Sequence, residues 1–202
     1  MQNFTQRWLF NSIYAVFLLL ASPWMLWRFI NGKSRRGWLQ KVFGFIPKRT
    51  ARGKCLWLHA VSVGEVNLLR TVIDELLAAS PKLQIAISTS TETGFDLAKQ
   101  KYEQHQVFFC PYDFSWAIQN VINPLKPAMI VLTELELWPN MIAVATKNQI
   151  PVSVINGRIS ENSFRGYQRF EFLTRSMLGN LSLVLAQTQT YADRFVELGC
   201  DS

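Results

Sequence analysis

Short apolar runs alternate with amphipathic stretches from residue 55 to the end of the 202-residue chain, and this alternation restricts the fold more than any other feature. Six runs are typical of strands, because they are brief, apolar and bounded by turn residues. The stretches between them repeat apolar residues at helical spacing, as Val66, Leu69 and Ile73 do. Such alternation with short connections predicts parallel strands, right-handed crossovers and a doubly wound, Rossmann-like α/β sheet.

The predicted elements have these bounds. Strands are expected at Cys55–Val61, Leu83–Thr89, Gln106–Cys110, Ala128–Thr133, Pro151–Ile155 and Leu181–Ala186. Helices are expected at Glu65–Ala79, Phe95–Gln104, Trp116–Leu125, Trp138–Asn148, Ser163–Leu178 and Thr190–Leu198. Ligands of such sheets bind beyond the carboxyl ends of the strands, near the point where the strand order reverses, so the loops after the strands are where chemistry is expected.

The composition is that of a folded protein. Hydrophobic residues make up 49% of the chain and charged residues 17%, which excludes a disordered or low-complexity protein. The three cysteines, Cys55, Cys110 and Cys200, are far apart and odd in number, which disfavours a disulfide scaffold and a zinc site. We therefore expect a reducing, cytosolic environment, no metal and no cofactor.

The amino-terminal part differs from the rest in charge. Residues 1–64 contain ten Lys or Arg and no acid, whereas residues 65–202 contain 11 basic and 14 acidic residues. Within this leader, Trp8–Trp27 is a run of twenty uncharged residues with Trp at both ends, long enough for a helix to cross a bilayer. The basic residues concentrate after the run, so residues 1–30 are expected to anchor the chain in a membrane, with the globular part facing the cytoplasm.

Three other interpretations of the run are weighed against a spanning helix. A cleaved signal peptide fits poorly, because the residues before the run are weakly charged and no small-residue cleavage site precedes the basic segment. A buried core helix is compatible with the polar residues Asn11, Ser12 and Ser22. A helix lying in the membrane interface is the serious rival, because Pro23 can break the span.

Residues 31–54 form a basic connecting segment between the leader and the first strand. Its cations can contact anionic lipid head groups, or serve as a platform for a phosphorylated lipid substrate. Nucleic acid is a third possible partner, but the apolar leader beside the segment argues against it.

The loop after the first strand, His59–Glu65, carries the first candidate for catalysis. Glu65 opens a helix at the carboxyl end of a strand, where it can take a proton from a hydroxyl group as a general base. The alternative is that Glu65 only complements the helix dipole, and residue chemistry alone does not separate the two. Ser62 and Gly64 are candidate ligand-binding residues, since a glycine lets a backbone approach a ligand closely. His59 is interpreted as a core or cleft-lining side chain rather than a ligand.

Three more loops carry polar groups. Thr91 and Gly94 lie in the hydroxyl-rich loop Ser88–Gly94, which can either cap a helix or offer N–H and O–H groups to a sugar or phosphate. Glu134 and Glu136 follow an almost purely apolar strand, where charges are unusual unless they are solvated or used. Arg158 follows the next strand and can pair with a cleft carboxylate or bind a phosphate in bidentate fashion.

Taken together, HAVSVGE, STSTETG, PYD, ELELWPN, IPVSVINGRIS and AQT…DRFVELG resemble the sequence landmarks of the Kdo (3-deoxy-D-manno-octulosonic acid) transferases, over essentially the whole chain. The resemblance implies a membrane-associated glycosyltransferase of lipopolysaccharide synthesis. Such enzymes transfer Kdo from CMP-Kdo to a lipid A precursor (lipid IVA), with inversion and without a required metal. It also implies a GT-B fold of two facing Rossmann-like domains, the N-terminal one handling the acceptor.

The resemblance assigns roles to two acids. Glu65 matches the family's proton acceptor, and Glu134 matches the first acid of the usual ETELWPN, which stabilises the transition state. Leu135 stands here for the usual Thr, and Asn156-Gly157-Arg158 for the usual Asn-Ala-Arg.

The family is about twice as long as this chain, and its CMP-binding domain, with a Lys a short distance beyond Ser202, has no counterpart here. Residues 55–202 are therefore expected to be the acceptor domain alone, and to be inactive without a donor half. The alternatives are an inactive lipid-binding remnant, another membrane-associated GT-B transferase and a generic Rossmann-like interaction domain. Donor binding and acceptor identity would separate the first two from a Kdo transferase, and the third does not require HAVSVGE and ELWPN at their positions.

Overall fold

The computed structural model describes residues 36–49, 53–136 and 138–201, together with Ser12. The anchor predicted at residues 1–30 lies outside these residues apart from Ser12, so it stays a prediction. Within the described parts of the chain, no helix combines the length and the apolarity needed to cross a membrane.

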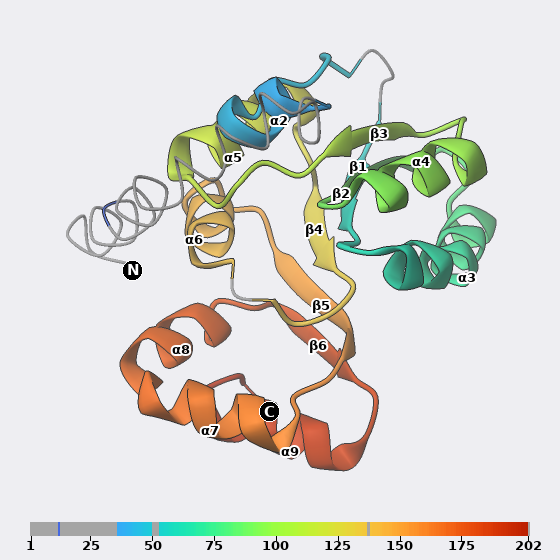
Figure 1. Ribbon diagram of the computed structural model, residues 1–202. Coiled ribbons are helices and arrows are strands. Elements are labelled where there is room, and N and C mark those ends of the chain that lie inside the picture. The colour runs from blue at the N-terminus through green and yellow to red at the C-terminus, as the bar shows by residue number, and fades with distance from the viewer. Residues whose placement is uncertain (1–11, 13–35, 50–52, 137, 202) are drawn as a thin grey trace.

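Six parallel strands form one sheet, as the alternation predicted (Figure 1). They are β1 (Cys55–His59), β2 (Gln84–Thr89), β3 (Gln106–Phe109), β4 (Met129–Leu132), β5 (Val152–Gly157) and β6 (Leu183–Ala186). Their order is β3-β2-β1-β4-β5-β6, so the chain builds outward from β1 to β3, returns to pair β4 with β1, and then builds outward to β6. The strand order therefore reverses between β1 and β4.

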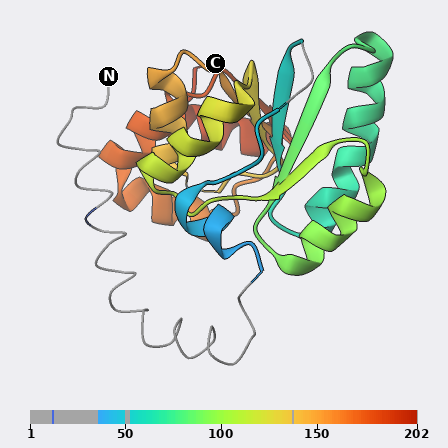
Figure 2. The same cartoon turned by 90° about the horizontal axis from the view of Figure 1, so that it is seen from above.

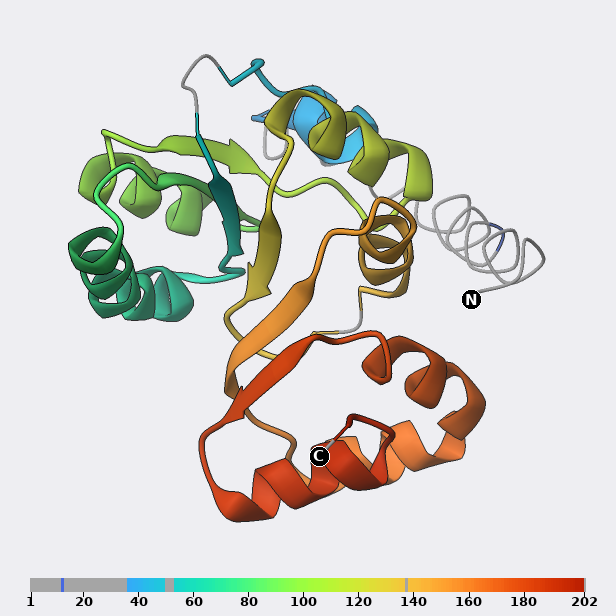
Figure 3. The same cartoon turned by 180° about the vertical axis from the view of Figure 1, so that it is seen from behind.

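The helices lie on both faces of the sheet (Figure 2). One face is covered by α3 (Val63–Ala79) and α4 (Glu92–Lys101). The opposite face carries α5 (Ser115–Leu125), α6 (Pro139–Lys147), α7 (Glu161–Arg169), α8 (Glu171–Leu178) and α9 (Gln189–Glu197). The short helix α2 (Trp38–Phe43) packs on α5 and on the edge strand β3, at the end of the sheet opposite to β6 (Figures 1 and 3).

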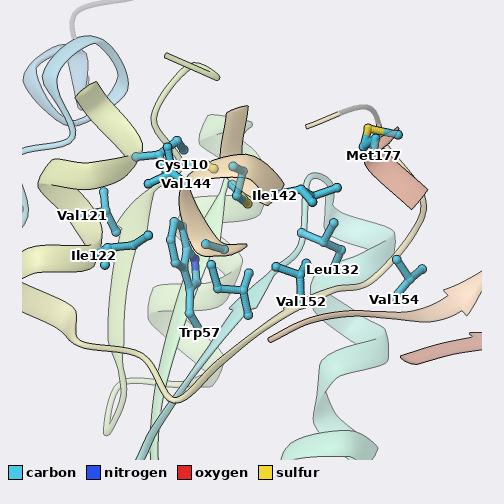
Figure 4. Packing of buried hydrophobic residues seen from close by; sticks show 14 of the residues in the cluster. Trp57, Cys110, Val121, Ile122, Leu132, Ile142, Val144, Val152, Val154 and Met177 are labelled. Carbon is cyan, nitrogen blue, oxygen red and sulfur yellow. The ribbon is translucent and has the colours of Figure 1, made fainter. Parts of the chain in front are cut away.

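Each face of the sheet has its own hydrophobic core. Alternate strand residues point to opposite faces, so Leu58 packs under α3 and α4 while Trp57 packs on the other side. Figure 4 shows the second core, in which Trp57, Val144 and Val152 come from β1, α6 and β5. The indole N–H of the fully buried Trp57 donates to Ser88 Oγ at 2.7 Å, which satisfies a donor that would otherwise be buried without a partner.

The predicted helix Ser163–Leu178 is wrong in one respect, because the structure divides it into α7 and α8 at Phe170. Phe170 leaves the helical region, with φ −115° and ψ 37°. The hydroxyl of the buried Thr174 lies within hydrogen-bonding distance of the carbonyls of Tyr167 and Phe170 at the break. Neither Pro nor Gly stands at the break, so the sequence offers no helix-breaking residue from which the division could have been predicted.

Candidate functional site

The candidate site lies at the carboxyl ends of β1 and β4, where the strand order reverses. Glu65 comes from the first turn of α3, directly after β1. Glu134 and Glu136 come from the loop between β4 and α6, and Thr91 from the loop after β2. The three predicted loops therefore meet at the same end of the sheet, because loops that follow parallel strands all leave from the carboxyl ends of those strands. The sequence pattern alone does not show which strands are neighbours.

Glu65 is only 9% exposed, and three hydrogen-bond donors hold its carboxylate. The N–H of Val61 and the hydroxyl of Thr133 both lie 2.8 Å from Oε2, and the hydroxyl of Ser62 donates to Oε1 at 3.0 Å. A carboxylate has about four lone-pair positions. One position therefore remains on Oε1, where a further hydroxyl group could donate.

Ser62 and Glu65 have the spacing of a capping box, the structural alternative for Glu65. In a capping box the serine accepts from the amide of the acid, and the acid accepts from the amide of the serine. Here Ser62 makes no side-chain cap and instead donates to Glu65, which accepts from the amide of Val61, one residue earlier. Glu65 thus fastens the loop, but its geometry is not that of a helix cap.

Thr91 and Gly94 hold the second loop against the first. Thr91 caps α4 by accepting from the Gly94 N–H at 3.1 Å, and its hydroxyl donates to the Val61 carbonyl at 3.2 Å. A Cβ on Gly94 would lie 2.8 Å from Thr91 Oγ1, so only glycine leaves the cap undisturbed. These contacts are internal to the protein, and acceptor binding by Thr91 and Gly94 stays a prediction.

Glu136 is a half-buried acid of the site. The indole N–H of Trp138 donates to its Oε2 at 3.1 Å. Burial and the neighbouring charge of Glu65 raise the pKa of Glu136, the Trp138 hydrogen bond opposes this, and Glu134 adds to it. Glu136 therefore holds a proton more readily than a solvent-exposed carboxyl group of the same kind.

His59 is a buried side chain that lies near Glu65 and contacts Trp138. It is buried, and its Nδ1 lies 2.8 Å from Ser88 Oγ. Burial lowers the pKa of His59 to about 4, although Glu65 and the Ser88 backbone act in the opposite direction. The imidazole is thus uncharged at neutral pH. It packs edge-on with Trp138, with 5.1 Å between the ring centroids, as expected for a core side chain. Within the described residues, no group of three or more His, Cys, Asp or Glu side chains is placed to hold a metal ion.

Arg158 extends from the end of β5 and is exposed. None of the ion pairs among the described residues joins it to Glu65, Glu134 or Glu136, so the predicted pairing with a cleft carboxylate is not seen. The binding of a phosphate remains open to it. Asn156, two residues before Arg158, has a left-handed backbone, with φ 57°, and accepts from the side chain of Gln187 at 2.7 Å.

Asp113 supports the acidic loop and was not singled out by the residue patterns, although it belongs to the PYD landmark. This buried carboxylate accepts from the backbone N–H groups of Asn140 and Met141 at 2.9 and 2.8 Å. The Asn140 side chain donates in return to the Asp113 carbonyl at 2.6 Å. Trp138, the residue at the N-cap of α6, makes no side-chain cap, so Asp113 supplies the cap from the loop after β3.

Comparisons with known proteins agree with this architecture. Residues 36–202 match the family described as 3-deoxy-D-manno-octulosonic-acid transferase (kdotransferase). A bifunctional glycosyltransferase/methyltransferase of Fusobacterium nucleatum is 34% identical over 170 residues, which are 79% of this chain and 26% of that protein. A 3-deoxy-D-manno-octulosonic acid transferase of Chlamydia trachomatis is 28% identical over 98% of this chain and 47% of its own length. The corresponding enzyme of Haemophilus influenzae is 30% identical over 71% of this chain and 34% of its own length.

Solved structures support the fold alone. A protein described as a UDP-N-acetylglucosamine 2-epimerase of Listeria monocytogenes superposes with a TM-score of 0.54 at 9% identity, over 74% of this chain and 44% of that one. This likeness shows a Rossmann-like sheet of the GT-B type. The chain spans half or less of the length of the relatives named above. Its match over residues 36–202 places it in the 3-deoxy-D-manno-octulosonic-acid transferase (kdotransferase) family.

Proposed function

We propose that this chain is the acceptor-binding part of an inverting glycosyltransferase of lipopolysaccharide synthesis, which transfers Kdo from CMP-Kdo to lipid IVA. The observation that carries the proposal is the Glu65 carboxylate, held by three donors at the switch point with one lone pair left on Oε1. Membership of the kdotransferase family supports the identity of the transferred sugar.

In the proposed reaction Glu65 takes the proton of an acceptor hydroxyl group. The hydroxyl oxygen forms a bond to the anomeric carbon of Kdo while the bond to CMP breaks, and CMP leaves with the electron pair. A single displacement of this kind inverts the anomeric centre. Glu134 supplies negative charge that stabilises the positive charge developing on the sugar. The residues that would contact the acceptor are Ser62, Gly64, Thr91, Gly94, Glu136 and Arg158, with the Arg158 guanidinium suited to a phosphate group.

The domain assignment is part of the same proposal. Residues 55–202 form the acceptor domain, and residues 31–54 connect it to the anchor at 1–30. CMP-Kdo is bound by a donor half, for which the relatives have enough additional length. We call this chain together with its donor half the complete enzyme. The decisive assay measures transfer of labelled Kdo from CMP-Kdo to lipid IVA by the complete enzyme. Vesicle binding without any transfer would instead favour a lipid-binding remnant, and transfer to another acceptor a different GT-B enzyme.

We also propose that the acceptor domain works at the surface of the inner membrane, on its cytoplasmic side. The support is the exposed apolar surface of α2 and the residues after it, which includes Trp38, Leu39, Phe43 and Phe45. Phe43 stacks on Phe45 and meets Trp38 edge-on. Arg36, Lys41 and Lys48 lie in or beside this segment of the chain. Aromatic side chains flanked by Lys and Arg are typical of segments that lie in a lipid interface.

Membrane binding is expected to depend on both the anchor and this surface. Deleting residues 1–30 should weaken binding to anionic vesicles, and the further changes Leu39→Glu and Phe45→Glu should reduce it again, measured by flotation. A matched control is Leu183→Glu with Leu185→Glu on the distant strand β6. These leucines are 51% and 53% exposed, close to the 54% and 59% of Leu39 and Phe45. Equal losses in both pairs, or no loss with the α2 pair, would contradict a specific lipid-facing surface.

Gly64 offers a separate test of acceptor binding. A Cβ at this position would meet only Ser62 Oγ, at 3.8 Å, and the backbone does not need a glycine because φ is not positive. Gly64→Ala is therefore expected to leave unfolding unchanged or to stabilise the first turn of α3 by up to about 1 kcal/mol. If the acceptor packs on Gly64, KM for the acceptor should rise about tenfold, as expected for a steric cost near 1.4 kcal/mol.

The control for this variant is Gly166→Ala in α7, where an added Cβ would meet nothing within 4 Å. It gives the same helix stabilisation away from the site and should leave KM unchanged. An unchanged KM in Gly64→Ala would remove Gly64 from the acceptor site.

A further inference from the structure

Thr133 follows β4 directly and is only 1% exposed. Its hydroxyl oxygen lies 2.8 Å from Glu65 Oε2 and 2.9 Å from the His59 carbonyl oxygen. A hydroxyl group has one proton, so it can donate to only one of these two acceptors at a time. The choice between them determines how Glu65 is held.

Two observations favour donation to Glu65 while that group is ionised. The His59 carbonyl already accepts from the backbone N–H of Thr133 at 3.1 Å, so it remains satisfied when the hydroxyl turns away. Hydrogen bonds to a charged acceptor are also roughly twice as strong as neutral ones. When Glu65 takes up a proton this advantage is lost, and the hydroxyl can turn to the His59 carbonyl.

The other groups around Glu65 give its negative charge little help. His59 at the end of β1 is uncharged at neutral pH, and Glu136 in the loop after β4 repels Glu65. Glu134 precedes Glu136 in that loop, and Glu92 lies in the first turn of α4, after the loop that follows β2. None of the ion pairs formed by the described residues includes Glu65. The charge therefore depends on its hydrogen-bond donors, of which Thr133 is the most deeply buried side chain.

We propose that Thr133 is a positioning residue whose hydroxyl donates to Glu65 and fixes its Oε2, so that Oε1 is left to accept from the acceptor hydroxyl group. The proposal rests on the proposed function for its catalytic meaning, because Thr133 acts through Glu65 and not on the substrate. It assigns part of the positioning of Glu65 to the residue that follows β4, outside the loop that carries Glu65.

The direct test is a ¹³C NMR titration of the Glu65 side-chain carboxyl group in this chain, in detergent micelles. Thr133→Val removes the hydroxyl at nearly constant shape and is expected to move the Glu65 titration midpoint up by about one to two pH units, the size of one charge-assisted hydrogen bond. Thr133→Ser keeps the hydroxyl and should titrate as the unchanged protein does. Ser62→Ala removes a donor that water can replace and should give a smaller shift than Thr133→Val.

Thr133→Val should still fold, because the His59 carbonyl keeps the Thr133 N–H and Oε2 keeps the Val61 N–H. A thermal melt checks this before titration. Equal midpoints in Thr133→Val and the unchanged protein would overturn the proposal, as would equal shifts in the Val and Ser variants.

The complete enzyme gives a second measurement. The acid limb of its pH–rate profile should move to higher pH in Thr133→Val, so the loss of rate is larger at pH 6 than at pH 9, and Thr133→Ser should restore the profile. A uniform loss at all pH values would indicate a structural role only. If Glu65→Gln left the rate of transfer intact, the proposed function would fail, whereas the NMR titration would still decide whether Thr133 holds the Glu65 charge.

Discussion

Replacing Glu65 with Gln is expected to lower the rate of Kdo transfer by the complete enzyme by about 10²–10⁴-fold, with the fold retained. A sugar hydroxyl group is a poor nucleophile while it keeps its proton, and an amide cannot accept that proton. The effect should appear in kcat, while KM for the acceptor changes little. The measurement is the initial rate with saturating CMP-Kdo and varied lipid IVA.

The surroundings of Glu65 explain why the glutamine should fit. The amide oxygen can take the place of Oε2 and accept from the Val61 N–H and the Thr133 hydroxyl. The amide nitrogen then faces Ser62 Oγ, which can rotate and accept instead of donating. No hydrogen bond of the loop must be lost, so the melting temperature should fall by only a few degrees.

The matched control is Glu92→Gln, which removes an acid from the first turn of α4 at the same edge of the sheet. Both substitutions lose a favourable helix-dipole charge, which contributes about 0.3–1 kcal/mol. Only the Glu65 variant should lose the rate. A Glu65→Gln enzyme that melts lower but turns over at a near-normal rate would assign Glu65 to structure and move the search for the base to Glu134 or Glu136.

The second large effect is expected at Asp113, whose loss acts on stability rather than chemistry. Asp113→Ala should lower the free energy of unfolding by about 3–5 kcal/mol, because two charge-assisted hydrogen bonds disappear and the amides of Asn140 and Met141 lose their acceptor while buried. This is a large share of the 5–15 kcal/mol typical of whole domains. Denaturant unfolding monitored by tryptophan fluorescence measures it.

Two comparisons make the Asp113 result specific. Asp193→Ala on α9 removes an exposed carboxylate that accepts from Gln189 one turn away, and should cost less than about 0.5 kcal/mol. Asp113→Asn keeps one acceptor oxygen and should fall between the two. A cost for Asp113→Ala as small as that for Asp193→Ala would show that the cap on α6 contributes little.

Local sequence was sufficient to predict the class of fold. A strand or helix imprints its own period on the apolar residues, so the six strands and the parallel α/β sheet were correctly predicted. The same reasoning placed Glu65 at a helix start beyond a strand, where the structure has it. The division of the predicted helix at Phe170 escaped it, because no helix-breaking residue marks the break, which shows only in the backbone angles of Phe170 and in the hydrogen bond from Thr174 back to the Tyr167 carbonyl.

The partners of the site residues that are distant in sequence were decided by the tertiary structure alone. Thr133 is 68 residues from Glu65 in sequence, and the two meet because β4 returns to pair with β1. Asp113 caps α6 across 27 residues for a similar reason, since the loop after β3 crosses over the start of that helix. Apolar periodicity reports which face of an element is buried, but not which strands are neighbours. The sequence by itself therefore determined the elements and the candidate acids, whereas the strand order decided which groups from other loops, such as the Thr133 hydroxyl, hold them.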